Sequence, residues 1–290
     1  MMVNIQVPEI LTSHQQLTTK DISFVYYNEL TPAGRNLITF NKCAISFILS
    51  GQKELYRGAE CTLVSEQEAI LIPNGNALIA ERKLNTKKYS SFVVFFPAQL
   101  AQAFIEKYLI KKPNLQQLDE TAEKDTFFKF QQTAYITEYL NGLIQLIKRG
   151  ESVPLALLSH KLEELFLVLM ESFPAHLYKI FMPVVSDNAN RLREIVEASI
   201  LKNLTLTELA FLTNRSLATF KRDFEKEYHV SPGKYLRERK LDAAQHQLKE
   251  GASIHEIYLQ LGYDNVSNFA AAFKNRFGLS PVIYQSKTQN

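Results

Sequence analysis

The last hundred residues of the chain contain one sequence pattern twice, and this repeat constrains the fold more than any other feature. Residues at corresponding points of the two copies are the same or similar, first at a separation of 48 positions and then of 49. The corresponding pairs are Thr205 and Ser253, Glu208 and Glu256, Asn214 and Gly262, Phe220 and Phe269, Phe224 and Phe273, Ser231 and Ser280, and Pro232 and Pro281. Two copies are too few to stack as a solenoid. We therefore expect the two units to act as a pair.

Each copy begins with a helix-start signal. Thr205 with Glu208, and Ser253 with Glu256, match the S/T-x-x-E pattern. In this pattern two side chains accept hydrogen bonds from backbone N–H groups that a helix start leaves unpaired. A helix is therefore expected to begin at each of these points.

A turn and a second helix follow in each copy. Asn214 and Gly262 stand where the first helix must end, and both residue types tolerate the left-handed backbone conformation of such a turn. Ser216 and Asn265 come next and are types that cap a helix start. Two short helices joined by such a turn are typical of the helix-turn-helix, whose second helix enters the DNA major groove.

The second helix of the first copy has one apolar face and one polar face. Phe220, Phe224 and Tyr228 recur at a spacing of four and should pack inward. The opposite face has a basic bias and is the first candidate DNA surface. Its members are Ala218, Thr219, Lys221, Arg222 and Lys226.

This arrangement resembles the AraC/XylS family of transcription regulators. The resemblance rests on LTELAFLTNRSLATFKRDFEKEYHVSP, the connecting segment KYLRERKLDAAQHQL and IHEIYLQLGYDNVSNFAAAFKNRFGLSP. It implies an all-α DNA-binding domain over residues 184–290. Within it, helix-turn-helix motifs at about 205–228 and 253–277 are joined by a linker helix at about 232–248. Family members place the two second helices in successive major-groove segments of a promoter and usually activate transcription, which implies RNA polymerase as a partner.

The resemblance also assigns roles to single residues. Arg222 is the best candidate for reading a guanine, because a guanidinium can donate two hydrogen bonds to O6 and N7. The candidate contacts in the second copy are Ser267, Asn268, Ala271 and Lys274. Ala271 stands where many family members have arginine, so this half is expected to position the protein more than to specify sequence. The alternative for both faces is a plain solvated helix surface.

The charge distribution agrees with a DNA-binding C-terminal region. The formal net charge is +3, and the excess positive charge lies within residues 187–290. Arg237, Arg239 and Lys240 in the connecting helix are candidates either for phosphate contact or for solubility alone. The segment 173–190 carries prolines and breaks the helical pattern, which favours a linker between two domains.

The N-terminal region reads as short strands that form a small barrel or a sandwich. The expected strands are 22–27, 43–49, 53–57, 68–72 and 89–96. The resemblance implies a cupin-like β-barrel over about 20–96, and the whole chain is thus expected to be α+β. The inward-facing residues are either one parity or the other of each strand, for example Ile45, Phe47 and Leu49, or Phe92, Val94 and Phe96.

No enzyme site is expected. Metal-dependent barrel enzymes need imidazole and carboxylate ligands that converge inside the barrel, and His14 is the only histidine before His160. We therefore expect no catalytic residue, no metal and no cofactor. A metal-free barrel enzyme fused to a DNA-binding domain, and an adaptor that binds protein through its helix-turn-helix pair, are the alternatives. The sequence has no long apolar run and no secretory leader, so a cytoplasmic location without membrane contact is expected.

Helices follow the strands and complete a regulatory domain over residues 1–183. Helical spacing covers 97–110 and 124–148, and a third helix opens after Pro154 within the helical region of about 97–182. In this third helix a leucine row has the spacing of a coiled-coil seam. Its members are Leu155, Leu158, Leu162, Leu165 and Leu169. The row is either a homodimer seam or internal core.

Residues 40–170, with the segment KLEELFLVL ahead of the DNA-binding domain, are also similar to activators of type III secretion genes. Those relatives respond to partner proteins rather than to sugars. Control of the N-terminal domain by a small-molecule effector and control by a regulatory protein therefore both stay open.

Overall fold

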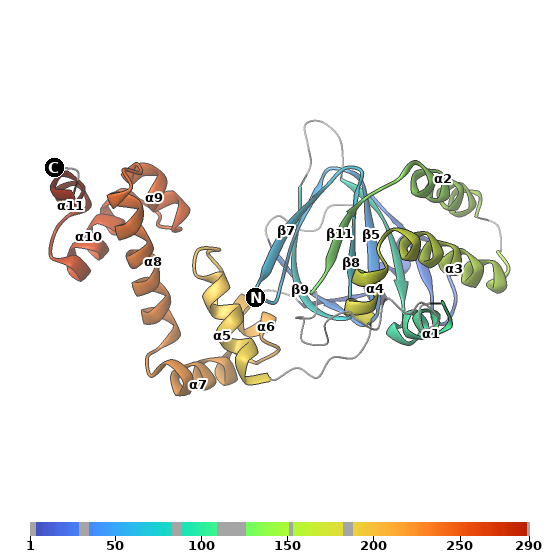
Figure 1. The fold of residues 1–290 in the computed structure, drawn as a ribbon, viewed down its shortest axis with the longest axis horizontal. Helices are drawn as coiled ribbons and strands as arrows, with labels where there is room; N and C mark the ends of the chain where they lie inside the picture. Colours follow the sequence, from blue (N-terminus) through green and yellow to red (C-terminus); the bar gives the residue numbers. More distant parts are fainter. Residues whose placement is uncertain are drawn as a thin grey trace. The chain divides into compact units, whose positions relative to one another are not determined.

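The computed structural model describes residues 4–28, 35–82, 89–108, 126–150, 153–181 and 188–288. The chain divides into two compact units, Met1–Ser186 and Asp187–Asn290 (Figure 1). The first unit is built on β-sheets covered by helices, and the second consists of helices.

Two mainly antiparallel sheets form the centre of the first unit. Sheet A has the order β1 (Asn4–Val7), β4 (Asn36–Phe40), β9 (Gly75–Arg82), β6 (Gln52–Arg57) and β7 (Glu60–Ser65). Sheet B has the order β11 (Phe128–Gln131), β8 (Glu68–Ile72), β5 (Cys43–Ser50), β10 (Ser90–Phe96), β3 (Ser23–Tyr27) and β2 (Gln15–Thr18). Only the β1–β4 pair is parallel among the pairings of these described strands.

The predicted α+β class is confirmed, but the expected closed barrel is two open sheets. Strands from outside the predicted range 20–96, namely β1, β2 and β11, form sheet edges. Among the described strands no pairing joins one sheet to the other. Because helices cover the far side of sheet B, this sheet is the middle layer of a stack rather than the wall of a barrel.

Sheet B is buried on both faces, and this explains its long apolar runs. Along β5, Cys43, Ile45 and Phe47 pack toward the helices, whereas Ala44 and Ile48 pack toward sheet A. The residues suggested by parity as inward-facing, including Ile45, Phe47, Phe92, Val94 and Phe96, therefore belong to the helix-facing core. The opposite parity faces the space between the sheets.

The helices of this unit are α1 (Ala98–Tyr108), α2 (Ala134–Arg149), α3 (Leu155–Ser172) and α4 (Pro174–Phe181). A 3₁₀ turn, η1 (Glu9–Ser13), precedes β2. The predicted helix over 124–148 was wrong in its first part, where strand β11 pairs with β8 instead. Pro174 begins α4 inside the segment predicted as linker, as suits a residue that lacks a backbone N–H.

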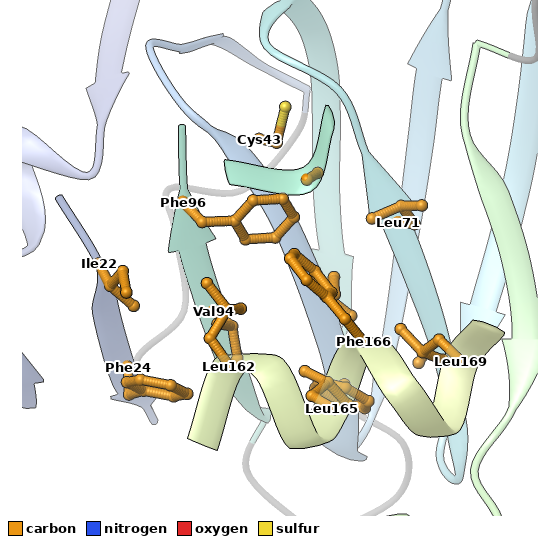
Figure 2. Close-up of a cluster of buried hydrophobic side chains, with 14 of the residues drawn as sticks. Ile22, Phe24, Cys43, Leu71, Val94, Phe96, Leu162, Leu165, Phe166 and Leu169 are labelled. Atoms are coloured by element: carbon orange, nitrogen blue, oxygen red, sulfur yellow. The ribbon is translucent and has the colours of Figure 1, made fainter. Parts of the chain in front are cut away.

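The leucine row of α3 packs mainly inside the unit. Leu158, Leu162, Leu165 and Leu169 are 1–3% exposed, whereas Leu155 is 65% exposed. Figure 2 shows this helix against the strands, with Leu162, Leu165, Phe166 and Leu169 pointing toward the side chains of sheet B. Four of the five leucines are thus core residues of a single chain.

The second unit has two small helical cores on one shared helix. Its helices are α5 (Asn188–Ser199), α6 (Leu206–Leu212), α7 (Leu217–Tyr228), α8 (Pro232–Lys249), α9 (Ile254–Gln260), α10 (Val266–Phe277) and α11 (Pro281–Thr288). The first end of α8 contributes Tyr235 and Leu236 to the core around Phe220 and Phe224. Its other end contributes Leu241, Ala244 and Leu248 to the core around Phe269 and Phe273. Both halves of the repeat are therefore built onto α8.

Candidate nucleic-acid interface

Local signals in the sequence fix the first helix of each motif. Thr205 Oγ1 accepts a hydrogen bond from Glu208 N–H at 3.2 Å, and a Glu208 carboxylate oxygen accepts one from Thr205 N–H at 2.7 Å. The predicted capping box is thus confirmed in the first copy. In the second copy Ser253 Oγ accepts from His255 N–H at 3.2 Å instead, so only its role as N-cap is confirmed.

The turns also have the predicted backbone. Asn214 and Gly262 have φ values of 57° and 76°, in the left-handed region that an asparagine or a glycine adopts most readily. Each second helix then ends at a left-handed residue, His229 in one copy and Gly278 in the other. The two motifs therefore share their turn geometry at both points.

Helix α7 presents a polar face away from its core. Ser216 Oγ caps the helix by accepting from Thr219 N–H at 3.1 Å. Phe220 and Phe224 are fully buried, which leaves the predicted Ala218, Lys221, Arg222 and Lys226 exposed. Thr219 is half-buried, and its hydroxyl lies 2.8 Å from that of Ser216.

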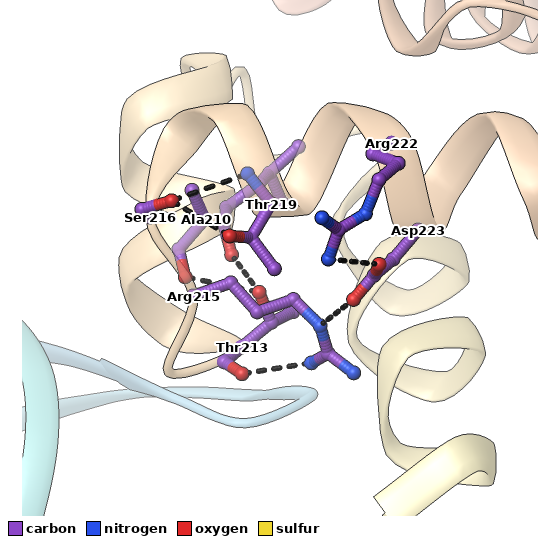
Figure 3. A network of polar contacts seen from close by, with 8 residues as sticks. Ala210, Thr213, Arg215, Ser216, Thr219, Arg222 and Asp223 are labelled. Carbon is purple, nitrogen blue, oxygen red and sulfur yellow. Dashed lines mark hydrogen bonds and ion pairs between the residues drawn. The ribbon is translucent and has the colours of Figure 1, made fainter.

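Arg222 lies at the edge of an ionic network that the sequence did not reveal (Figure 3). Arg215 in the turn bonds Asp223 through Nε at 3.0 Å and the Thr213 carbonyl through Nη1 at 2.8 Å. Arg222 contacts the other Asp223 oxygen at 3.4 Å. The hydrogen bond from Arg215 is the main reason that the pKa of Asp223 is lowered. Arg222 is 77% exposed, so its guanidinium is held only loosely in this network.

Helix α10 is capped and oriented in the same way. Asn265 Oδ1 accepts from Asn268 N–H at 2.8 Å, and Phe269 and Phe273 are fully buried. The four predicted contact residues of this helix are therefore exposed: Ser267, Asn268, Ala271 and Lys274. Lys274 is the only one of the four with a long side chain.

The arginine of α10 binds the connecting helix. Arg276 contacts the Asp242 carboxylate through Nε at 2.9 Å and through Nη2 at 2.7 Å. A further contact of 3.6 Å reaches Glu238, one helical turn earlier on α8. Arg276 thereby ties α10 to α8.

A second set of contacts ties the two motifs to each other. Lys240 Nζ donates to Asn203 Oδ1 at 2.7 Å and to the Leu261 carbonyl at 3.0 Å. Asn203 Nδ2 donates to the Gln260 carbonyl at 2.8 Å. A Cβ atom on Gly262 would lie 2.8 Å from the Asn203 side chain, so this position needs glycine for space as well as for its φ. We call Asn203, Lys240 and the carbonyls of Gln260 and Leu261 the Asn203 latch.

Two of the basic residues on α8, Lys240 and Arg239, are engaged by groups within the protein. Lys240 was a candidate for phosphate contact or solubility, but its ammonium bonds protein groups and burial lowers its pKa. Arg239 bonds Glu197 at 3.3 Å, beside the Tyr228 and Tyr235 hydroxyls on the same carboxylate. No local sequence pattern marks these pairings, since their members lie 21 to 57 positions apart.

The described residues contain neither a metal-binding cluster nor a membrane-spanning helix. Within the described ranges, no three His, Cys, Asp or Glu side chains gather closely enough to hold a metal ion. No described helix is both long enough and apolar enough to cross a membrane.

Two helix-turn-helix units on one shared helix, each with an exposed polar second helix, define a DNA-binding transcription regulator of the double helix-turn-helix class. The protein-family model described as a helix-turn-helix domain matches residues 209–287. The protein-family model described as the ExsA N-terminal regulatory domain matches residues 43–179. The chain belongs to the AraC/XylS family, in the branch of the type III secretion activators.

Two curated relatives and one solved structure are similar to this chain. The HTH-type transcriptional regulator ExsA of Pseudomonas aeruginosa is 26% identical over 77% of this chain and 81% of its own. The thermoregulatory protein LcrF of Yersinia pestis is 27% identical over 50% of this chain and 54% of its own. Among solved structures, unsaturated fatty acid bound ToxT from Vibrio cholerae aligns over 93% of this chain and 96% of its own, with 15% identity and a TM-score of 0.42. The curated relatives are regulators, and this protein is likewise a regulator and not an enzyme.

Proposed function

We propose that the protein is a sequence-specific activator that inserts α7 and α10 into successive major-groove segments of a promoter. The observation that carries this proposal is that both helices are fixed to α8 with their polar faces exposed. Helix α8 has 18 residues, and at 1.5 Å per residue it is about 27 Å long. This length suits two recognition helices, α7 and α10, that bind within about one DNA turn of ~34 Å.

The two halves have different tasks in this proposal. Arg222 reads a guanine, with Lys221, Lys226 and the N-terminal end of α7 around it. Helix α10 has Lys274 for a phosphate and only short side chains at its other contact positions, so it anchors the protein on the duplex.

The N-terminal unit controls this activity through a small-molecule effector or a partner protein. A homodimer on DNA would use the outer side of α3, where Leu155 and Leu167 are 65% and 41% exposed. Relatives named as transcriptional activators support a role in activation, and RNA polymerase is the partner that such a role implies. Because its proposed partner is promoter DNA, we expect the protein to act in the cytoplasm.

The test starts from selection of a binding site out of random duplexes, followed by footprinting. We expect protection of two adjacent major-groove segments on one face and binding that weakens steeply with salt. Substitution Arg222→Ala should cost about 1–3 kcal/mol at one base position, whereas Lys274→Ala should weaken binding evenly and lower the salt slope by about one. A protein that selects no sequence and shows little affinity for any DNA would instead be an adaptor that uses the two motifs to bind protein.

A further inference from the structure

In the first helix-turn-helix unit, one carboxylate is shared by two guanidinium groups. One oxygen of Asp223 on α7 accepts from Arg215 Nε at 3.0 Å, and the other oxygen lies 3.4 Å from Arg222 Nη2. Figure 3 shows both arginine side chains directed at this carboxylate. The three side chains together carry one net positive charge, so the acid does not cancel the basic character of the exposed face of α7.

Arg215 is held firmly at the inner end of this network. Its Nη1 donates to the Thr213 carbonyl at 2.8 Å, and its side chain is 21% exposed. Thr213 is buried, and its hydroxyl donates to the Leu209 carbonyl at 3.0 Å and to the Ala210 carbonyl at 2.9 Å. The position of the Asp223 carboxylate is therefore fixed from the end of α6, through the turn.

Arg222 forms the outer end of the network and is much less constrained. Its side chain is 77% exposed, compared with 34% for Asp223. Neighbouring residues on a helix point about 100° apart, so Arg222 reaches Asp223 by turning its side chain toward that carboxylate. A guanidinium has five N–H groups, and a guanine uses two of them, for O6 and N7. A third N–H can donate to Asp223 at the same time.

A role for Asp223 in the turn alone does not explain its contact with Arg222. The pair of Arg215 and Asp223 would hold the turn without a second guanidinium. An acid on a DNA-facing helix is also repelled by the phosphates of a bound duplex. In the second copy, at a separation of 49, the counterpart of Arg222 is Ala271. The counterpart of Asp223 is Ala272, so the arginine and the acid are replaced together.

We propose that Asp223 is a positioning residue for base recognition, which holds the Arg222 guanidinium in the orientation that reads a guanine. Because the contact restrains the guanidinium before DNA binds, less side-chain entropy is lost when Arg222 binds a base. Asp223 acts through Arg222 and contacts no base itself. This inference rests on the proposed function, since it adds a specificity-determining residue to the proposed contact of Arg222.

The role concerns the choice of base rather than the overall affinity. A restrained guanidinium fits O6 and N7 of guanine, and the other bases lack this pair of acceptors. Removal of Asp223 releases Arg222 toward phosphates and other bases, and it also removes a negative charge from near the duplex. The preference for guanine should therefore fall, while the affinity for random DNA stays the same or rises. A turn that merely misfolds would lower both.

The experiment is fluorescence anisotropy of the full chain on three duplexes at one salt concentration. They are the selected site, the same site with the guanine of Arg222 replaced, and a random sequence. We expect Asp223→Ala to lower the ratio of affinities for the first two duplexes about two- to tenfold, as for the ordering of one long side chain, and not to weaken binding to the third. Glu225→Ala is the matched control, because it removes an equal charge from an exposed position of the same helix. Its ratio should equal the native one.

Combination with Arg222→Ala shows whether Asp223 acts through Arg222. The single variant Arg222→Ala identifies the guanine, and addition of Asp223→Ala should then cause no further loss of preference at any position. A further loss would mean that Asp223 contacts a base itself, and this would overturn the positioning role. An unchanged ratio for Asp223→Ala, or weaker binding to all three duplexes, would overturn it as well.

Melting curves check that each variant folds. If Asp223→Ala unfolds, Asp223→Asn keeps the shape of the side chain and takes its place in the same measurements. Its ratio should also fall, but by less, because a neutral acceptor makes a weaker hydrogen bond to a guanidinium; an unchanged ratio would again overturn the proposal.

The positioning role and the proposed function fail in different ways. If Arg222→Ala changes no base preference, the assignment of Arg222 as the reader is wrong, and the role of Asp223 is wrong with it. If Arg222→Ala loses the preference for guanine but Asp223→Ala keeps it, only the positioning role is wrong.

Discussion

Substitution Lys240→Met tests whether the Asn203 latch sets the register of the two DNA-reading helices. Methionine keeps most of the apolar stem and removes the ammonium, together with its bonds to Asn203 at 2.7 Å and to Leu261 at 3.0 Å. Hydrogen bonds of charged groups contribute about 1.5–3 kcal/mol each. Because Lys240 is only half-buried, we take the low end for the pair, about 1.5 kcal/mol, which corresponds to about tenfold in an equilibrium constant.

The loss should appear only where both motifs must bind together. Once the latch is broken, the arrangement that fits a complete site is less populated, and the apparent affinity falls by that fraction. We expect binding to a complete site to weaken, by at most about tenfold because the apparent affinity follows the populated fraction, and binding to an isolated first half-site to stay unchanged. The variant should also tolerate insertion of one base pair between the half-sites better than the native protein does.

The assay is electrophoretic mobility shift on complete, half and respaced sites, with Lys249→Met as the matched control. Lys249 is an exposed lysine at the end of the same helix. Equal affinities of the two variants on the complete site, with the same response to spacing, would refute a role for the latch in register.

Three further predictions concern stability. Leu162→Ala should cost about 2–5 kcal/mol in chemical denaturation because this leucine is 3% exposed, whereas Leu155→Ala should change stability by less than about 0.5 kcal/mol; equal effects would contradict the packing of α3. Thr205→Ala should cost about 1 kcal/mol and more than Ser253→Ala, since only the first copy has a reciprocal capping box; the reverse order in thermal melting would be inconsistent with it. Burial and Glu197 raise the pKa of Tyr235 to about 12, so its contribution is full below the unfolded pKa of about 10 and is lost as pH rises toward 12; Tyr235→Phe should flatten this part of the unfolding profile, and an unchanged slope would exclude Tyr235 as its source.

The structure of the C-terminal unit could be predicted from the sequence because its main signals are short-range interactions. The capping signal at Thr205, the left-handed positions Asn214 and Gly262, and the spacing of Phe220 and Phe224 each act within a few residues of themselves. Such signals can be recognised in a single sequence because the groups that interact are close together in the sequence.

Features that depend on distant partners were missed. Strand β11 carries helical spacing, but pairing with β8 decides its conformation. Parity could not tell which face of β5 meets sheet A, because helices bury its other face equally well. The same holds for Asn203 and Lys240, whose contact joins residues 37 positions apart.

The repeat therefore produces two motifs with one architecture and different uses of arginine. In the first, Arg222 is 77% exposed, and within the described part of the chain a 3.4 Å contact with Asp223 is its hydrogen bond, which leaves it available for the base contact that we propose. In the second, Arg276 is bound to Asp242 and close to Glu238, and the outward position belongs to Ala271. The guanidinium of the second helix thus fixes that helix to α8. In the proposed complex with DNA, the second half has only short side chains and one lysine at its contact positions, so it contributes specificity by fixing where the first half lies. The prediction for Lys240 tests whether the Asn203 latch sets the register that this requires.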